Sequence, residues 1–259
     1  MRIIYFLTIA VASLFLIPMN LSADQVRDAD SLWNQGVELY NAGKWSEAAD
    51  AFLEIESMGV ESAGLYYNIG NCYFRQENAL GKAILYYERS LKLDPSFDDA
   101  RFNLSMAQAA TLDSIESVPP FILVTWLHGL MDCLNSNSWA VISLTLFVLT
   151  AVLLLLFRFG FSLSLRKVSF FASLITLIFA LISFGFSVAS GKDAQSHDEA
   201  VVTARDCSVK SAPSQIEKTL FILHEGTKVS VLDNVGQWER VKLGDGREGW
   251  VMTDYIETI

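Results

Sequence analysis

The chain has 259 residues, of which 52% are hydrophobic, and a formal net charge of −10 at pH 7. This length exceeds one ordinary domain, and the apolar residues are gathered into long runs, so some of them are expected to face lipid. Acidic residues outnumber basic ones by 16 to 7 in residues 24–117 and by 12 to 8 in residues 191–259. Neither part offers the basic face that nucleic acid requires, which excludes a nucleic-acid-binding class.

Residues 1–23 have the pattern of a signal peptide. Arg2 precedes an apolar stretch over residues 3–17, and two small residues come directly before Asp24. A basic start, an apolar core and a small-residue cleavage site are typical of export signals. We expect cleavage after Ala23; retention as a membrane anchor is the alternative.

Two later runs, residues 139–157 and 168–190, contain no charged residue. As helices they reach about 28 and about 34 Å, which is enough to cross a hydrocarbon core of about 30 Å. The predicted turn between them, residues 158–167, carries three basic residues and no acid. The positive-inside rule places this turn in the cytoplasm. We therefore expect an integral membrane protein whose other parts lie on the outer side.

Small side chains recur along the second run at spacings of three and four residues. They are Ser169, Ser173, Thr176, Ala180, Ser183 and Ser187. Such residues allow close approach and hydroxyl hydrogen bonds between helices in lipid. The sequence predicts a helix–helix contact here, made either with the first span or with the helix of a partner.

Residues 24–112 show self-similarity with a period of 34 to 35 residues. The matching pairs are Gly36 and Gly70, Ala48 and Ala83, and Phe52 and Tyr87. This pattern, with Pro95 closing the second unit, resembles tetratricopeptide repeats, in which small residues lie where antiparallel helices touch. Residues 99–110 match the first helix of a third unit. We expect an all-α array of helical hairpins.

Tetratricopeptide arrays hold extended peptides on the inner face of the first helix of each unit, and the resemblance implies such a groove here. Asn34, Asn68 and Asn103 share one equivalent position, and an amide can both donate to and accept from a peptide backbone. Asn71 and Arg75 lie one and two turns from Asn68 and are expected to add a contact to a carboxylate. The alternative is that these side chains only occupy a solvated helix face.

Residues 113–138 contain the proline pair Pro119–Pro120, which is followed by apolar residues at helical spacing over 121–134. The apolar stretch is too short to span a membrane. It is typical of an interfacial amphipathic helix, with Trp126 at the depth of the headgroups.

Residues 191–259 have β character, with a tight-turn signal at Asp245 and Gly246. The predicted strands cover residues 201–204, 208–212, 228–232, 238–243, 248–252 and 255–256. Together with Gly249–Trp250 and Tyr255–Ile256, the pattern resembles bacterial SH3-like domains. The resemblance implies that Trp238, Trp250 and Tyr255 border a ligand groove, often one for cell-wall peptides.

No cofactor, metal site or catalytic group is predicted. Cys72, Cys133 and Cys207 lie in separate segments without metal-ligand spacing and are interpreted as packing residues, with a redox-active thiol as the alternative. His224 is interpreted as a turn residue because no nucleophile accompanies it. We expect a binding protein rather than an enzyme.

The order of these parts resembles BatE-type proteins of the Bacteroides aerotolerance group, with residues 70–75 and 82–91 carrying much of the likeness. The expected fold is multi-domain: all-α helical hairpins, a two-helix transmembrane hairpin and a small all-β SH3-like barrel. The resemblance implies a bacterial inner-membrane scaffold with periplasmic modules, working with von Willebrand-type and tetratricopeptide membrane proteins in oxidative-stress tolerance. The alternative is a cell-envelope sensor that binds peptidoglycan or peptide through the SH3-like domain.

Overall fold

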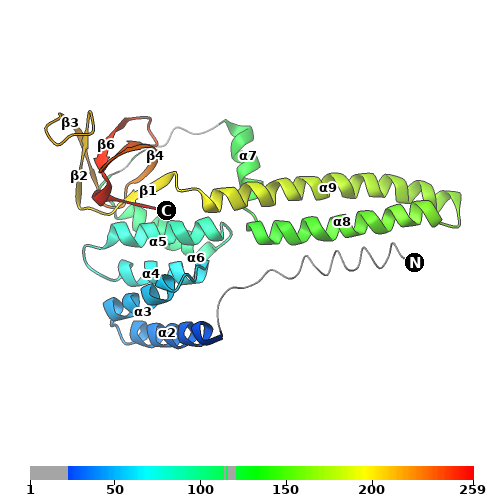
Figure 1. Cartoon of the computed structure of the whole chain (residues 1–259), viewed down its shortest axis with the longest axis horizontal. Helices are drawn as coiled ribbons and strands as arrows, with labels where there is room; N and C mark the ends of the chain where they lie inside the picture. Colours follow the sequence, from blue (N-terminus) through cyan, green and yellow to red (C-terminus); the bar gives the residue numbers. More distant parts are fainter. Residues whose placement is uncertain (1–22, 114, 116–120) are drawn as a thin grey trace.

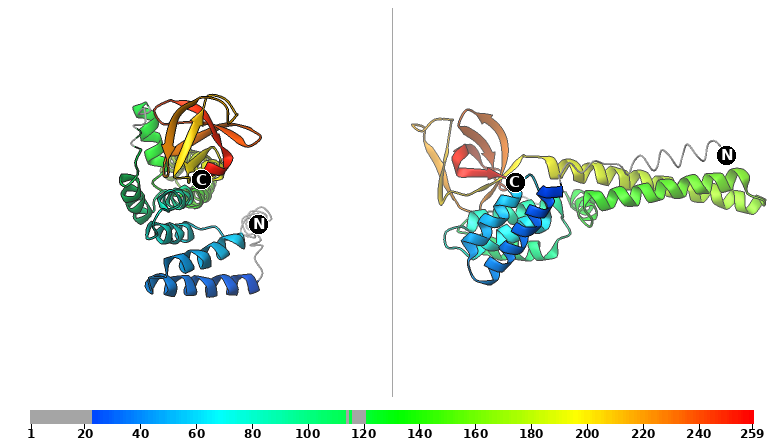
Figure 2. Two further views of the ribbon diagram at one scale, coloured as in Figure 1. Left: turned by 90° about the vertical axis from the view of Figure 1, so that its left-hand side faces the viewer. Right: turned by 60° about the horizontal axis from the view of Figure 1, so that its bottom comes forward.

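The computed structural model describes residues 23–113, 115 and 121–259, with side chains from residue 27 onward. The predicted signal peptide therefore lies almost wholly outside the described residues. Figure 1 shows a stack of helices, a small β module above it, and a long helical hairpin that extends away from both. The turned views in Figure 2 also place the helical stack and the β module together at one end of the hairpin.

The helical stack consists of five helices, each in contact with the next along the chain. Its helices are α2 (Ala23–Asn41), α3 (Trp45–Ser57), α4 (Ala63–Phe74), α5 (Leu80–Leu93) and α6 (Asp98–Ala109). A Cβ atom on Gly36 would lie 2.7 Å from the ring of Phe52, and one on Gly70 would lie 2.8 Å from the ring of Tyr87. The two helix pairs thus pack in the same way, as the repeat period predicts. Their assignment to the tetratricopeptide class stays a prediction.

Local signals set the helix ends in this stack. The Ser62 hydroxyl accepts a hydrogen bond from the backbone N of Leu65 at 3.1 Å and caps the start of α4. Helix α5 ends at Leu93, two residues before Pro95, because the residue before a proline avoids the helical conformation. The buried core of the stack runs between the helices and includes Phe52, Leu65, Ile69, Cys72, Ile84 and Tyr87.

The hairpin consists of α8 (Ser136–Phe159) and α9 (Leu163–Gln195), both long and apolar enough to cross a membrane. The turn between them is shorter than the predicted segment 158–167, because only residues 160–162 lie outside the helices. Arg166 Nε donates to the carbonyl of Gly160 at 2.8 Å and helps to close this turn. Helix α9 continues through residues 191–195, so the β module begins at Glu199 rather than at residue 191.

The small-residue stripe of α9 faces α8. The Ser143 hydroxyl donates to the carbonyl of Ala180 at 3.1 Å, and the hydroxyls of Thr150 and Thr176 lie 2.9 Å apart. Near the open end, the Ser187 hydroxyl donates to the carbonyl of Ser136 at 3.1 Å. Of the two contacts that the sequence left open, the structure shows the one within the chain.

Helix α7 (Ile122–Met131) lies at the open end of the hairpin and runs across the hairpin axis in Figure 1. The Trp139 indole N–H donates to the carbonyl of Met131 at 2.9 Å and links α7 to α8. Asp113 and Ile115 contact the β module, so the predicted interfacial segment 113–138 begins too early.

The β module is a seven-stranded antiparallel sheet with the order β3-β2-β6-β5-β4-β1-β7. Its strands are β1 (Glu199–Val202), β2 (Asp206–Lys210), β3 (Thr219–His224), β4 (Lys228–Val235), β5 (Trp238–Lys242), β6 (Glu248–Met252) and β7 (Ile256–Thr258). A short helix, η1 (Thr253–Tyr255), precedes β7. The curled sheet encloses Val202, Cys207, Val209, Val241 and Val251. Strand β3 is not among the strands predicted from the sequence.

Candidate binding site between the helical stack and the β module

Two of the three aromatic residues predicted to border the SH3-like groove share one surface. Trp238 on β5 and Trp250 on β6 are half-buried, whereas their strand neighbours Glu239 and Val251 are buried. Since side chains alternate between the faces of a strand, both tryptophans lie on the outer face. Tyr255 lies in η1 and packs against the buried core of the β module. The predicted three-residue groove therefore contains two tryptophans on the surface and a tyrosine that supports the core.

Among the residues predicted to line the groove of the helical stack, Asn71 rather than Asn68 makes the connecting hydrogen bonds. The Asn71 side-chain oxygen accepts hydrogen bonds from the Asn103 amide and the Tyr87 hydroxyl, both at 2.8 Å. Asn68 is half-buried on the same helix, Asn34 is exposed on α2, and Arg75 is exposed at the end of α4. The structure brings together Asn71 of α4 and Asn103 of α6, whereas Asn34 lies exposed on α2.

The helical stack and the β module share a buried core. Val201 of β1 is fully buried and Ile259 is 7% exposed, and both pack into the core cluster of the helices. Arg89 of α5 donates to the carbonyl of Thr258 at 2.7 Å, and Lys92 donates to that of Ile259 at 2.7 Å. The β module is thus fixed against α5 by apolar burial as well as by hydrogen bonds.

Two glycines allow this close approach. A Cβ on Gly81 of α5 would lie 2.7 Å from the carbonyl oxygen of Val202. Gly226 has a φ of +89°, and a Cβ there would lie 2.7 Å from both Ile84 and Thr111. A side chain at Gly81 would overlap the backbone and push the two parts apart, whereas one at Gly226 would displace the ends of the Ile84 and Thr111 side chains.

A partly buried ion network crosses the junction. Lys228 Nζ lies 3.0 Å from Oε2 of Glu88 on α5 and 2.8 Å from Oε2 of Glu199 on β1. Burial alone lowers the pKa of Lys228, but Glu88 and Glu199 outweigh it, so the net pKa is raised. The lysine therefore remains charged and paired at the contact.

A second network joins the segment after α6 to the β module. Asp113 Oδ1 lies 2.8 Å from Nδ1 of His224, and Asp113 Oδ2 accepts from the backbone N of His224 and the hydroxyl of Thr227, both at 2.7 Å. The interpretation of His224 as a turn residue is wrong, because it ends β3 and contacts Asp113 and, at 3.8 Å, Asp206. This arrangement holds two parts of the chain together.

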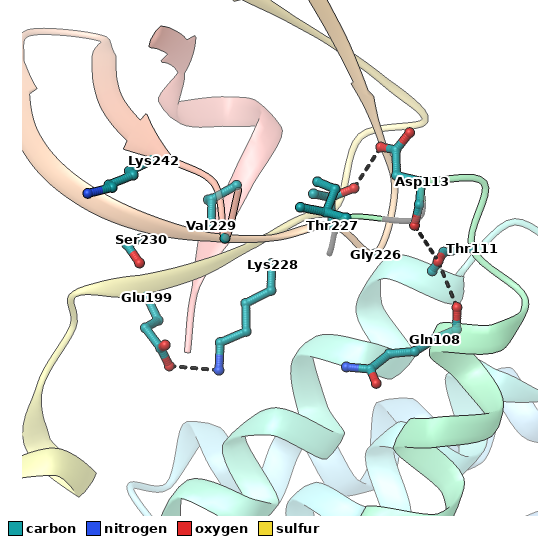
Figure 3. A pocket seen from close by; sticks show the side chains of 12 residues that line it. Gln108, Thr111, Asp113, Glu199, Gly226, Thr227, Lys228, Val229, Ser230 and Lys242 are labelled. Carbon is teal, nitrogen blue, oxygen red and sulfur yellow. Dashed lines mark hydrogen bonds and ion pairs between the residues drawn. The ribbon is translucent and has the colours of Figure 1, made fainter. Parts of the chain in front are cut away.

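A cleft of about 610 Å³ opens beside these networks. Its walls come from both parts, as Figure 3 shows, with Gln108 on α6 across the space from Ser230 on β4, whereas the Lys242 ammonium points away from Gln108. Further lining residues are Thr111, Asp113, Ile115, Glu199, Gly226, Thr227, Lys228, Val229 and Gly244. Amide, hydroxyl and ammonium groups can all bond a peptide backbone or a carboxylate, so the cleft suits a polar, extended ligand.

Sequence reasoning missed the residues that build this junction. Asp113 and His224 are 111 positions apart, and Lys228 and Glu88 are 140 positions apart. Local periodicity does not indicate contacts between parts of the chain that are far apart in the sequence. The one available signal was the apolar and β-branched run from Thr219 to His224, which identifies β3 and would have placed His224 on a strand.

Residues 206–257 match the bacterial SH3 domain family. The comparison with curated proteins found no match for the chain. The matched range begins at β2 and ends within β7, so it leaves out β1 and the last two residues. The β module is a bacterial SH3 domain with short additions at both ends. These additions carry Val201 and Ile259, which enter the core of the helical stack.

Proposed function

We propose that the chain is a membrane-anchored binding protein whose helical stack and SH3 domain act as one unit to hold an extended peptide. The observation that carries this proposal is the cleft of about 610 Å³ whose two walls come from the two parts. A bacterial SH3 domain favours a peptide or peptidoglycan ligand. The proposed activity is binding rather than catalysis.

The membrane location is part of the proposal. Its support is the pair of long apolar helices and the position of Arg158, Arg166 and Lys167 at the closed end of the hairpin. The positive-inside rule assigns that end to the cytoplasm. The helical stack and the SH3 domain lie at the opposite end and are therefore assigned to the outer, periplasmic side (Figure 1).

Two sources of the peptide are distinguished by their sites. A scaffold in an oxidative-stress complex, with von Willebrand-type and tetratricopeptide partners, would use the helical groove around Asn71 and Asn103. A cell-envelope sensor would take peptidoglycan stem peptides into the cleft or onto the surface of Trp238 and Trp250. The cleft favours the hypothesis that the SH3 domain binds a peptide, because the cleft is a recess with walls from both the SH3 domain and the helical stack.

The test is a titration of the full chain in nanodiscs with peptidoglycan stem peptides, followed by affinity purification from membranes. Ser230→Trp fills the cleft from its exposed side and should abolish binding, whereas Ser211→Trp, an exposed position outside the cleft, should not change it. Binding that survives Ser230→Trp but disappears with Trp250→Ala would move the site to the tryptophan surface and refute the cleft. Loss of a protein partner with Asn103→Ala alone would favour the scaffold.

A further inference from the structure

A groove of about 450 Å³ lies between α7 and the outer part of α9. Its apolar lining comes from both helices, with Leu127 and Met131 on one side and Phe186 and Ala189 on the other. Its polar lining includes Lys192 and Asp198. The groove thus has two chemically different ends.

The change from apolar to polar lies where the membrane boundary is expected. The uncharged part of α9 begins after Lys167, and a hydrocarbon core of about 30 Å takes about 20 residues from there. This count reaches the region of Phe186 and Ala189. Lys192 follows Phe186 by about 9 Å along the helix, which places it among the headgroups.

Helix α7 forms the other wall of the groove and has the exposed apolar surface expected at the membrane boundary. Ile122 and Trp126 are 71% and 72% exposed, and the helix contains no Asp, Glu, Lys or Arg. It runs across the hairpin axis (Figure 1), which places it parallel to the membrane surface if the hairpin spans the bilayer. The apolar surface of the groove is then continuous with the lipid-facing surface of the hairpin.

We infer that this groove binds a phospholipid of the outer leaflet whose zwitterionic headgroup carries a primary ammonium group. The acyl chain packs against the apolar lining, Lys192 contacts the phosphate, and the carboxylates of Asp193 and Asp198 accept from the ammonium. Lys192 is the one Lys or Arg among the lining residues and lies there with two carboxylates, which disfavours a purely anionic headgroup. A headgroup with a quaternary ammonium is also disfavoured, because it cannot donate hydrogen bonds to the carboxylates of Asp193 and Asp198. This inference rests on the proposed membrane location.

The experiment uses the full chain reconstituted in phospholipid vesicles. Flotation after an alkaline wash first establishes whether the chain is inserted. Photoactivatable phosphatidylethanolamine, phosphatidylcholine and phosphatidylglycerol probes are then compared by mass spectrometry of the labelled peptides. We expect phosphatidylethanolamine to label α7 and the outer part of α9 about fivefold more than the other two probes, the scale that ion pairs near a surface support.

Two variants and a matched control locate the effect. Ala189→Trp fills the apolar part and should remove the preferential labelling, whereas Leu181→Trp, at a 54% exposed position elsewhere on α9, should preserve it. The double change Asp193→Asn and Asp198→Asn should remove the preference for phosphatidylethanolamine over phosphatidylcholine and raise labelling by phosphatidylglycerol, because Lys192 then remains without the two acids. Equal labelling of the unchanged protein, or a preference for phosphatidylglycerol, overturns the assigned site although insertion holds. A chain that does not float overturns the membrane proposal itself.

Discussion

Nδ1 of His224 lies 2.8 Å from Oδ1 of Asp113, and this contact joins the end of β3 to the segment that follows α6. Asp113 also accepts from the backbone of His224 and the hydroxyl of Thr227. A single carboxylate therefore holds the helical stack and the SH3 domain at one edge of their junction, where both partners of the contact titrate.

The contact predicts a pH-dependent junction. The hydrogen bond that the His224 ring donates to Asp113 raises the pKa of His224, so its stabilising effect is complete below the ordinary histidine pKa of about 6.5 and is lost as the pH rises through the raised value. Burial by itself raises the pKa of Asp113, but the bonds from His224 and Thr227 outweigh it and lower it, so the carboxylate contributes above about pH 4 and fails at lower pH.

We therefore expect His224→Gln to lower the melting temperature at about pH 6 and to have a smaller effect at about pH 8.5. His197→Gln, at an exposed position, is the control and should show no such dependence. A deficit that stays constant across this range would show that His224 contributes packing alone.

Lys228→Met should destabilise the junction by about 2 kcal/mol, because Glu88, with its side chain 13% exposed, loses its cation in a partly buried place. Chemical denaturation in detergent measures the change. Lys218→Met removes an exposed lysine of the same domain and should change the free energy of unfolding by less than about 0.5 kcal/mol. Equal effects of the two substitutions would contradict the role of the network.

Gly226→Ala should separate the helical stack from the SH3 domain. Gly226 and Gly246 have φ values of +89° and +91°, but a new Cβ meets Ile84 and Thr111 at 2.7 Å only at Gly226 and has nothing within 4 Å at Gly246. Both variants carry a backbone strain of about 1 kcal/mol, because alanine disfavours a positive φ. Any difference in behaviour between the two variants therefore comes from the close approach at Gly226. Spin-label distances between the two parts should lengthen in Gly226→Ala and stay unchanged in Gly246→Ala.

Ser183→Leu should loosen the hairpin by about 1–3 kcal/mol, because Ser183 is 5% exposed and added methylenes cannot fit between α8 and α9. Phe184→Leu, at a neighbouring position that is 54% exposed, should have little effect. Resistance to unfolding by SDS measures both. Similar losses in the two variants would mean that the stripe does not determine hairpin stability.

The thiols predict a labelling pattern that also tests orientation. Cys72 and Cys207 are buried, which raises the pKa of each thiol to about 12, whereas Cys133 is exposed. An impermeant maleimide added outside spheroplasts should label Cys133 alone. A cysteine introduced by Ser162→Cys, in the turn of the hairpin, should react only after lysis. Labelling of Ser162→Cys from outside would reverse the proposed orientation.

Local patterns were sufficient for some parts of this structure. The two long apolar helices and the C-terminal SH3 domain were predicted from charge-free length and from tryptophan and glycine spacing. The contacts of Gly36 and Gly70 follow from the repeat period, because the same steric need recurs in each unit. These features depend on residues close together in the sequence or on a repeated motif.

Other features depend on how the parts fit together. The two hydrogen bonds that Asn71 accepts from Asn103 and Tyr87 join three helices, and the contact of Asp113 with His224 crosses a domain boundary. The expectation that all three cysteines pack is wrong for Cys133, which lies exposed after α7. Its surroundings depend on where α7 lies, and the sequence pattern alone does not fix that position.

Helix α9 runs unbroken over 33 residues, and only residues 196–198 separate it from β1. Lys92 of α5 donates to the carbonyl of Ser196 in this connection and to that of Ile259, whose backbone N donates to the carbonyl of Glu199 at the start of β1. The connection between the SH3 domain and the hairpin is consequently short and held by hydrogen bonds. A ligand that tilts the SH3 domain against the helical stack must either break these bonds or apply a torque to α9, and, in the proposed membrane location, the far end of that helix lies on the cytoplasmic side.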